Sequence, residues 1–90
     1  MAQASSERSV TLPQDVALHA RPAGQFVKTA AGFRSRVIVS TDRREADAKS
    51  ILSVLALGAR GGVSLTLSAE GEDAEAAISA LAHCISELHD

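Results

Sequence analysis

The pattern of apolar and polar residues predicts four short strands in this chain. Alternation, which turns apolar side chains toward one face of a strand, is strictest in VSLTLSA and also marks the segment that ends at Leu12. The segment RVIVS is rich in β-branched residues, and the turn residues after it allow the chain to pair back as an edge strand. The expected strands cover residues 8–12, 36–40, 44–47 and 63–69.

Apolar residues that recur every three or four positions predict three helices. The first run is built around Phe26 and stops at Gly32, and the last begins with acidic residues that suit the positive end of a helix. The expected helices cover residues 20–31, 50–57 and 72–88. The order β-α-β-β-α-β-α, with elements this short, predicts an α+β fold in which helices cover one face of an antiparallel sheet.

Composition narrows the class of protein. Ninety residues, 46% hydrophobic and 22% charged, predict one globular domain over residues 1–90, with the small and polar residues 1–6 disordered. A formal net charge of −2 and the absence of Trp and Tyr argue against a nucleic-acid partner. No run is long enough to span a membrane, and the first residues lack the apolar core of a signal peptide. Cys84 is the single cysteine, which rules out an internal disulfide and fits a cytoplasmic protein. We also expect a monomer.

The stretch LHARPAG introduces candidate chemistry at the start of the first helix. Pro22 is tolerated in a first turn, so it places the helix start at about His19 or Ala20. The backbone N–H groups of Ala20 and Arg21 would then point outward and, with the helix dipole, form an anion site. Arg21 adds a positive charge and a planar fork that suits phosphate.

His19 lies beside this predicted phosphate site. The positive helix end and Arg21 disfavour imidazolium, and a neutral imidazole can accept a phosphoryl group as a phosphoramidate. No general base that would activate water is apparent, and the nearest carboxylate in the sequence is Asp15. Without such a base, a phosphorylated His19 should hydrolyse slowly, which suits a phosphate carrier better than a hydrolase. The spacing alone leaves open that His19 is a surface residue or a cap.

Two segments resemble the signatures of HPr, the histidine phosphocarrier of the bacterial phosphoenolpyruvate:sugar phosphotransferase system. LHARPAGQFVKTAAGF resembles its active-site segment, and ADAKSILSVLALG resembles its second signature. The resemblance implies an open-faced β-sandwich of four antiparallel strands and three helices. It implies that His19 is phosphorylated through Nδ1, with Arg21 as its phosphate partner. Enzyme I would donate the phosphoryl group and the IIA unit of a sugar permease would receive it, without a cofactor or a metal.

Two residues depart from the family pattern. HPr proteins usually carry glycine where Ala17 stands, so the presentation of His19 is in question. Gly24 stands inside the first helix where alanine is commoner, and it costs about 1 kcal/mol of helix stability.

The start of the second helix offers a regulatory and a docking candidate. Serine is a preferred N-cap, which is sufficient to explain Ser50. In some bacteria, however, a kinase phosphorylates the matching serine of HPr, so Ser50 is a candidate regulatory site and an HPr kinase a candidate partner. By the same resemblance Ile51 and Leu52 belong to an apolar docking surface. The residues expected to flank this surface, beside Arg21, are Lys28 and Lys49.

Three rival functions remain open at this point. A regulatory domain of the same fold would act through phosphorylated Ser50, but it would not need His19 and Arg21. A carrier of the nitrogen-linked branch is the second alternative to sugar uptake, and the residues do not distinguish the two branches. A histidine-dependent phosphatase is disfavoured because a second catalytic group is missing. We expect His83, Cys84 and His89 to be surface residues and not metal ligands.

Overall fold

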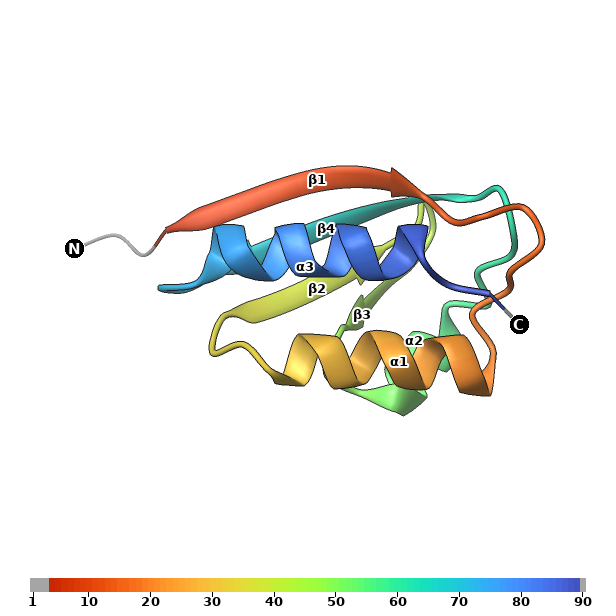
Figure 1. The fold of residues 1–90 in the computed structure, drawn as a ribbon, viewed down its shortest axis with the longest axis horizontal. Coiled ribbons are helices and arrows are strands. Elements are labelled where there is room, and N and C mark those ends of the chain that lie inside the picture. The colour runs from red at the N-terminus through yellow and green to blue at the C-terminus, as the bar shows by residue number, and fades with distance from the viewer. Residues whose placement is uncertain (1–3, 90) are drawn as a thin grey trace.

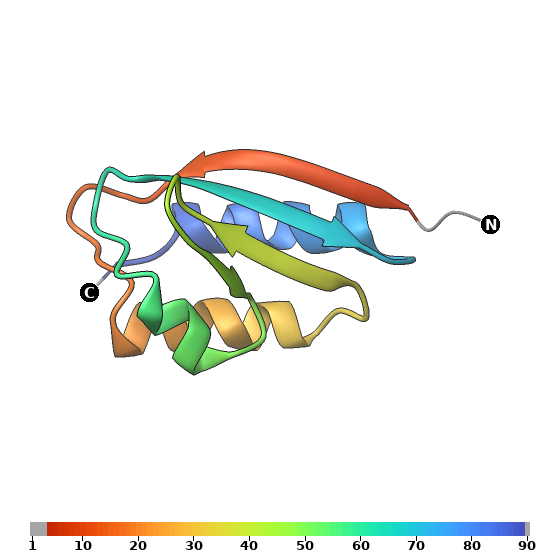
Figure 2. The same cartoon turned by 180° about the vertical axis from the view of Figure 1, so that it is seen from behind.

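The structure is a computed structural model, and it describes residues 4–89. Four strands form one antiparallel sheet, and three helices cover one of its faces (Figures 1 and 2). The predicted α+β class and the predicted order of elements are confirmed. Along the chain the elements are β1 (Ser5–Thr11), α1 (Ala20–Ala31), β2 (Arg36–Ser40), β3 (Glu45–Asp47), α2 (Ile51–Ala56), β4 (Ser64–Glu70) and α3 (Ala74–Ser86).

Alternating side chains give the sheet one apolar face. The strands lie in the order β1-β4-β2-β3, and every neighbouring pair is antiparallel. In β2, Val37 and Val39 are buried, and in β4 the buried residues are Leu65, Leu67 and Ala69, with half-buried residues between them. The apolar face therefore belongs to the core, and the opposite face is left open.

The helices bury their apolar stripes against that face. α3 packs on β1 and β4, and α1 lies between α3 and α2. Phe26 of α1 is the largest fully buried side chain. The stripe predicted for the last helix is buried throughout, at Ala74, Ala77, Ile78, Leu81, Ile85 and Leu88. Within residues 4–89, no helix has the length and apolarity needed to cross a membrane.

The expectation that residues 1–6 are disordered is wrong for Ser5 and Ser6, while residues 1–3 lie outside the described residues. Ser5 pairs with Glu70 and Ser6 with Ala69, so β1 follows β4 along its whole length. The N–H of Gly71 also donates to the carbonyl of Ala4 at 2.9 Å. These backbone hydrogen bonds form whatever the side chains are, so the polar sequence gave no sign of them.

Other boundaries shift by one or two residues because capping residues stand just outside the elements. Ser50 caps α2, which begins at Ile51, and Asp73 stands in the N-cap position of α3. Arg44 lies before β3, and its carbonyl accepts the N–H of Thr41 at 2.8 Å to close the turn.

Asp73 joins the start of α3 to the segment before β2. Its carboxylate accepts the N–H groups of Arg34 and Ser35, each at 2.9 Å, and the hydroxyl of the buried Ser35. The Ser35 hydroxyl and then the Arg34 N–H are the main causes that lower the pKa of Asp73 from 3.8 to about 2. These hydrogen bonds between Asp73 and residues 34–35 form a joint between α3 and the segment before β2. Gly71 allows the close approach at this joint, because a Cβ there would lie 2.7 Å from the Cα of Ser35.

Candidate functional site

The segment before α1 holds His19 at the surface. Val16 and Leu18 are buried, at 2% and 3% exposure, while His19 is exposed. The N–H of Leu18 donates to the carbonyl of Ala59 at 2.9 Å, and the N–H of His19 donates to the carbonyl of Ala17 at 2.9 Å. The backbone that carries the imidazole is therefore fixed by burial and by hydrogen bonds.

His19 is the N-cap residue of α1, with an extended backbone (φ −93°, ψ −169°). Its carbonyl accepts the first helical hydrogen bond, from the N–H of Ala23 at 2.9 Å, but its imidazole does not cap the helix. Pro22 is buried in the first turn, where its missing N–H costs nothing. Within residues 4–89, the N–H groups of Ala20 and Arg21 have no acceptor, so both are available to an anion.

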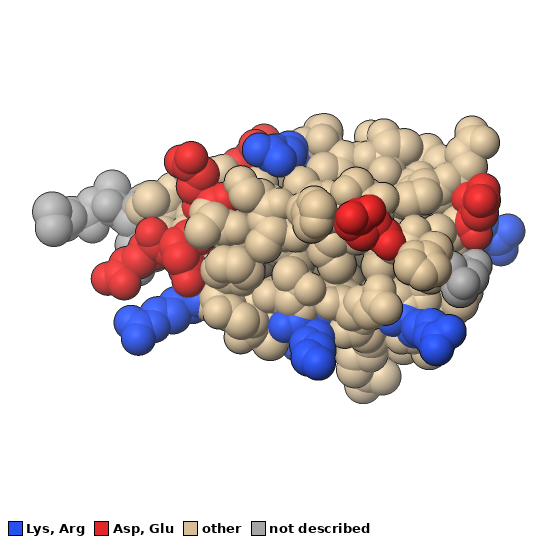
Figure 3. Space-filling model, viewed as in Figure 1, with Lys and Arg blue, Asp and Glu red and all other residues tan. Residues whose placement is uncertain are grey.

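Arg21 supplies the positive charge of this helix start. Its side chain is exposed and has no carboxylate partner among the residues that the structure describes. In Figure 3, Lys and Arg side chains lie along the lower edge, partly over α1, and others lie at the upper and right-hand edges, while acidic side chains lie above α1 toward α3 and β1. The exposed cations of α1 are Arg21 and Lys28. The structure thus brings His19, Ala20 and Arg21 together at a basic edge of the molecule.

Ser50 caps α2, as its position predicted. Its Oγ accepts the N–H of Ser53 at 3.3 Å, and its carbonyl accepts the N–H of Val54 at 3.0 Å. After Ser50 the helix exposes two large apolar side chains, Ile51 at 38% and Leu52 at 77% exposure. Two adjacent exposed apolar side chains make this helix start a candidate contact surface.

The family model described as the PTS HPr component phosphorylation site matches residues 6–87. This chain belongs to the HPr family. It is 37% identical over 83 residues to the phosphocarrier protein HPr of Vibrio cholerae, a match that covers 92% of this chain and 98% of that protein.

A solved HPr structure has the same fold. The crystal structure of HPr-C-His from Thermoanaerobacter tengcongensis superposes with a TM-score of 0.86 at 42% identity, covering 90% of this chain and 91% of that one. The chain is also 45% identical over 71 residues to the multiphosphoryl transfer protein of Xanthomonas campestris pv. campestris. That match covers 79% of this chain but 8% of the longer protein.

Membership of the HPr family decides the general function. HPr proteins are phosphocarriers of the phosphotransferase system and not enzymes, and this chain is a phosphocarrier of that kind. The predicted resemblance to the HPr family, the α+β fold class and the phosphocarrier function are confirmed.

The two departures from the HPr pattern are accommodated without strain. No described residue other than glycine has a positive φ, so Ala17 needs none of the backbone freedom of a glycine. A Cβ added to Gly24 would have no atom within 4 Å, so the space for an alanine is present.

Lys49 does not lie beside Arg21 as expected. Its Nζ donates to the carbonyl of Phe33, just beyond the end of α1, at 2.7 Å. Because α1 has 12 residues, this point is about 18 Å along the helix from its start. Lys49 therefore flanks the start of α2 alone, and the basic edge near His19 consists of Arg21 with Lys28.

The sequence pattern did not identify the segment between α2 and β4 as a contact of the segment that carries His19. Two consecutive glycines, Gly61 and Gly62, indicate a turn between the second helix and the last strand, but the sequence does not indicate that this turn meets the segment before α1. A Cβ on Gly61 would lie 1.9 Å from the carbonyl oxygen of Gln14, so only glycine allows the two backbones to approach this closely. The double glycine was the one available signal.

The remaining candidates stay apart from the site. His83 is exposed, with its Nε2 3.8 Å from a carboxylate oxygen of Glu87, and His89 is exposed near the end of the chain. Cys84 is half-buried against the core. Within residues 4–89, no group of three His, Cys, Asp or Glu side chains is placed to hold a metal ion.

Proposed function

We propose that His19 accepts a phosphoryl group through Nδ1 from phospho-enzyme I and passes it to the IIA unit of a sugar permease. The observation that carries this proposal is the helix start itself. An exposed imidazole on a fixed backbone stands beside the N–H groups of Ala20 and Arg21 and beside the Arg21 guanidinium, and none of these three groups has a partner within residues 4–89. These groups match what a phosphohistidine requires.

The proposed transfer moves one phosphoryl group between nucleophiles. The lone pair of Nδ1 attacks the phosphorus of the phosphohistidine on enzyme I, and the N–P bond of the donor breaks as the new N–P bond forms. The N–H groups of Ala20 and Arg21 and the Arg21 guanidinium stabilise the negative phosphoryl oxygens. The second transfer reverses these roles, with His19 as the leaving group. A carrier of this kind requires that water hydrolyse the phosphoramidate slowly between the two encounters.

We further propose that α1 and α2 form the docking surface. Ile51 and Leu52 provide an exposed apolar centre, Lys28 and Arg21 provide positive charge on α1, and Lys49 flanks the start of α2. An apolar centre with basic surroundings suits brief contacts with acidic partners. We also propose that the protein is cytoplasmic and works as a monomer, in agreement with transfer between diffusing proteins.

We infer a regulatory role for Ser50 in addition to its role as a cap. A phosphate there would add about −1.5 to −2 charge beside Ile51, on the surface that acidic partners approach. A purely regulatory copy would not need His19 and Arg21, so the carrier function is preferred. The sugar branch is preferred to the nitrogen-linked branch on resemblance alone.

The test is to mix the protein with phosphoenolpyruvate and catalytic enzyme I, and to follow phosphate bound to the protein. The expected product is one phosphate per chain that is labile in acid and stable in base, absent from His19→Ala and present in His83→Ala as a matched control. Phosphate that appears on His83 or His89 of the His19→Ala variant would overturn the assignment.

A further inference from the structure

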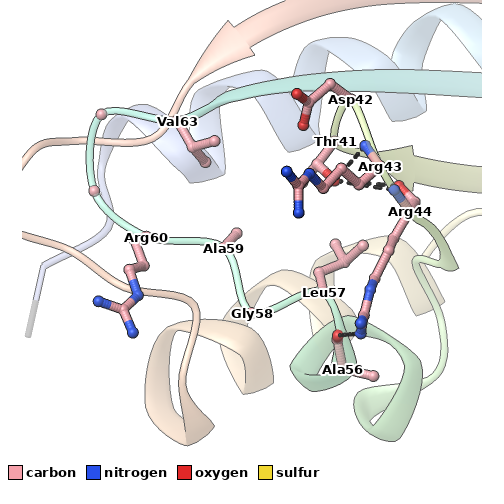
Figure 4. A pocket seen from close by; sticks show the side chains of 12 residues that line it. Thr41, Asp42, Arg43, Arg44, Ala56, Leu57, Gly58, Ala59, Arg60 and Val63 are labelled. Atoms are coloured by element: carbon pink, nitrogen blue, oxygen red, sulfur yellow. Dashed lines mark hydrogen bonds between the residues drawn. The ribbon is translucent and has the colours of Figure 1, made fainter.

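A basic cavity lies between the turn from β2 to β3 and the segment from α2 to β4 (Figure 4). Its volume is about 710 Å³, within the range of small-molecule sites. Charged side chains of both segments line it, and Leu57, Ala59 and Val63 supply apolar surface. None of its lining residues belongs to α1 or to the segment before it, although Ala59 in its wall accepts the N–H of Leu18, the residue before His19.

The charge of the cavity differs from that of the whole chain. Three arginines, Arg43, Arg44 and Arg60, line it against one aspartate, Asp42, which leaves an excess of two positive charges in a chain of net charge −2. Figure 4 shows the guanidinium of Arg43 reaching from the turn across the cavity toward Ala59. Among residues 4–89, the guanidinium groups of Arg43 and Arg60 have no hydrogen-bond or ion-pair partner. Their donors are therefore available to an anion.

The backbones that carry these arginines are fixed. The N–H groups of Arg43 and Arg44 donate to Thr41 Oγ1 at 3.3 and 3.2 Å, and Arg44 Nη1 donates to the carbonyl of Ala56 at 3.0 Å. On the opposite wall, the carbonyl of Ala59 accepts the N–H of Leu18 at 2.9 Å. A site whose walls are already ordered loses less conformational entropy when a ligand binds.

We propose that this cavity binds a small molecule that carries a phosphate group and an apolar body. Guanidinium groups bind phosphate through paired hydrogen bonds, and Arg43 extends into the cavity. Arg60 lines the cavity from the other segment, and its side chain, which points away from Arg43 in Figure 4, would turn inward to meet the same phosphate. The ligand's body would contact Leu57 and Val63, which an anion alone would not use. This ligand site is distinct from the transfer of phosphate through His19 and does not depend on it.

The test is an NMR titration of the ¹⁵N-labelled protein at constant ionic strength, with phenyl phosphate and with inorganic phosphate as probes. Shifts of amide signals are expected at residues 41–44 and 56–63, with tighter binding of phenyl phosphate. Arg43→Gln and Arg60→Gln should each weaken that binding by about tenfold, the loss expected for one charge-assisted pair. Arg36→Gln, which removes an equal charge from β2 outside the cavity, should leave it unchanged.

Three results would overturn the proposal. Shifts confined to residues 19–22 and insensitive to Arg43→Gln would show that phosphate binds only at the start of α1. Equal affinity for phenyl phosphate and inorganic phosphate would show that the apolar body of the ligand does not contact the cavity. Shifts of the cavity residues by a polyglutamate peptide, without shifts by phenyl phosphate, would mark a contact for an acidic protein segment instead.

Discussion

His19 owes its chemistry to its neighbours in the chain as much as to its own ring. The buried Leu18 before it fixes the backbone, and the buried Pro22 after it fixes the first turn without using an N–H. Between these two anchors, His19, Ala20 and Arg21 are all exposed. Five residues thus set an imidazole, two N–H donors and a guanidinium at one end of a helix, and each can be altered separately.

Arg21→Ala is expected to slow phosphoryl transfer from enzyme I by about 10- to 100-fold, because one charge-assisted interaction with the phosphoryl group is lost. The side chain is exposed and unpaired within residues 4–89, so the free energy of unfolding should change by no more than about 0.5 kcal/mol. Quenched-flow transfer rates and thermal unfolding measure the two effects. Arg21→Lys keeps the charge but loses the planar fork, so its transfer rate should lie between those of the wild type and Arg21→Ala. An unchanged rate in Arg21→Ala would show that the N–H groups alone stabilise the phosphoryl group.

At the scale of elements, the two helices that form the proposed docking surface each have a feature that lowers helix stability. α1 contains a glycine at position 24, and α2 has only six residues, so its single side-chain cap at Ser50 carries a large share of its stability. Both weaknesses lie away from the apolar core. Substitutions there should therefore change helix stability without repacking the fold.

Gly24→Ala is expected to stabilise the protein by about 0.5–1 kcal/mol, since alanine has less backbone entropy to lose in a helix. The added Cβ meets no atom within 4 Å. Thermal unfolding should show a higher midpoint with an unchanged transfer rate. Gly61→Ala is the matched contrast, because its Cβ would lie 1.9 Å from the carbonyl oxygen of Gln14 and should destabilise the protein strongly. A lower midpoint for Gly24→Ala would show that α1 needs glycine there.

Ser50→Asp should separate capping from docking. A carboxylate keeps the cap and adds a favourable charge of about 0.3–1 kcal/mol at the helix start, so stability should stay equal or rise slightly. The same charge stands beside Ile51 and should weaken transfer from an acidic enzyme I, most strongly at low salt. Ser50→Ala loses the cap, about 1 kcal/mol, without adding charge. Transfer by Ser50→Asp as fast as by the wild type at low salt would leave Ser50 as a cap alone.

At the scale of the whole molecule, patterns within one segment predicted the elements, and contacts between distant segments escaped prediction. Phe26 and the stripe of α3 follow helical spacing, so their burial could be foreseen from sequence. The N–H of Leu18 meeting the carbonyl of Ala59, and Lys49 reaching Phe33, depend on how the loops fold back. HPr resemblance supplied the role of His19, which the spacing alone had left open.

Asp73 is the clearest of these distant contacts, and its effect on stability depends on pH. Its pKa is lowered from 3.8 to about 2 in the folded protein, so the carboxylate stabilises the fold fully above about pH 4, and this contribution is lost as the pH falls toward 2. Asp73→Asn should therefore lower the unfolding midpoint at pH 7, because an amide cannot accept all three hydrogen bonds from Arg34 and Ser35. The difference from the wild type should shrink between pH 4 and pH 2, which thermal unfolding across that interval measures.

The control for Asp73→Asn is Glu72→Gln. Glu72 is exposed and makes no side-chain hydrogen bond or ion pair within residues 4–89, so its loss removes the same charge from the same turn without breaking the joint. Its unfolding midpoint should follow that of the wild type at every pH. If the midpoint of Asp73→Asn differs from the wild type by the same amount at pH 2 and at pH 7, then the joint does not act through the carboxylate charge. The buried Ser35 and the close approach of Gly71 would then account for how α3 is fixed to the segment before β2.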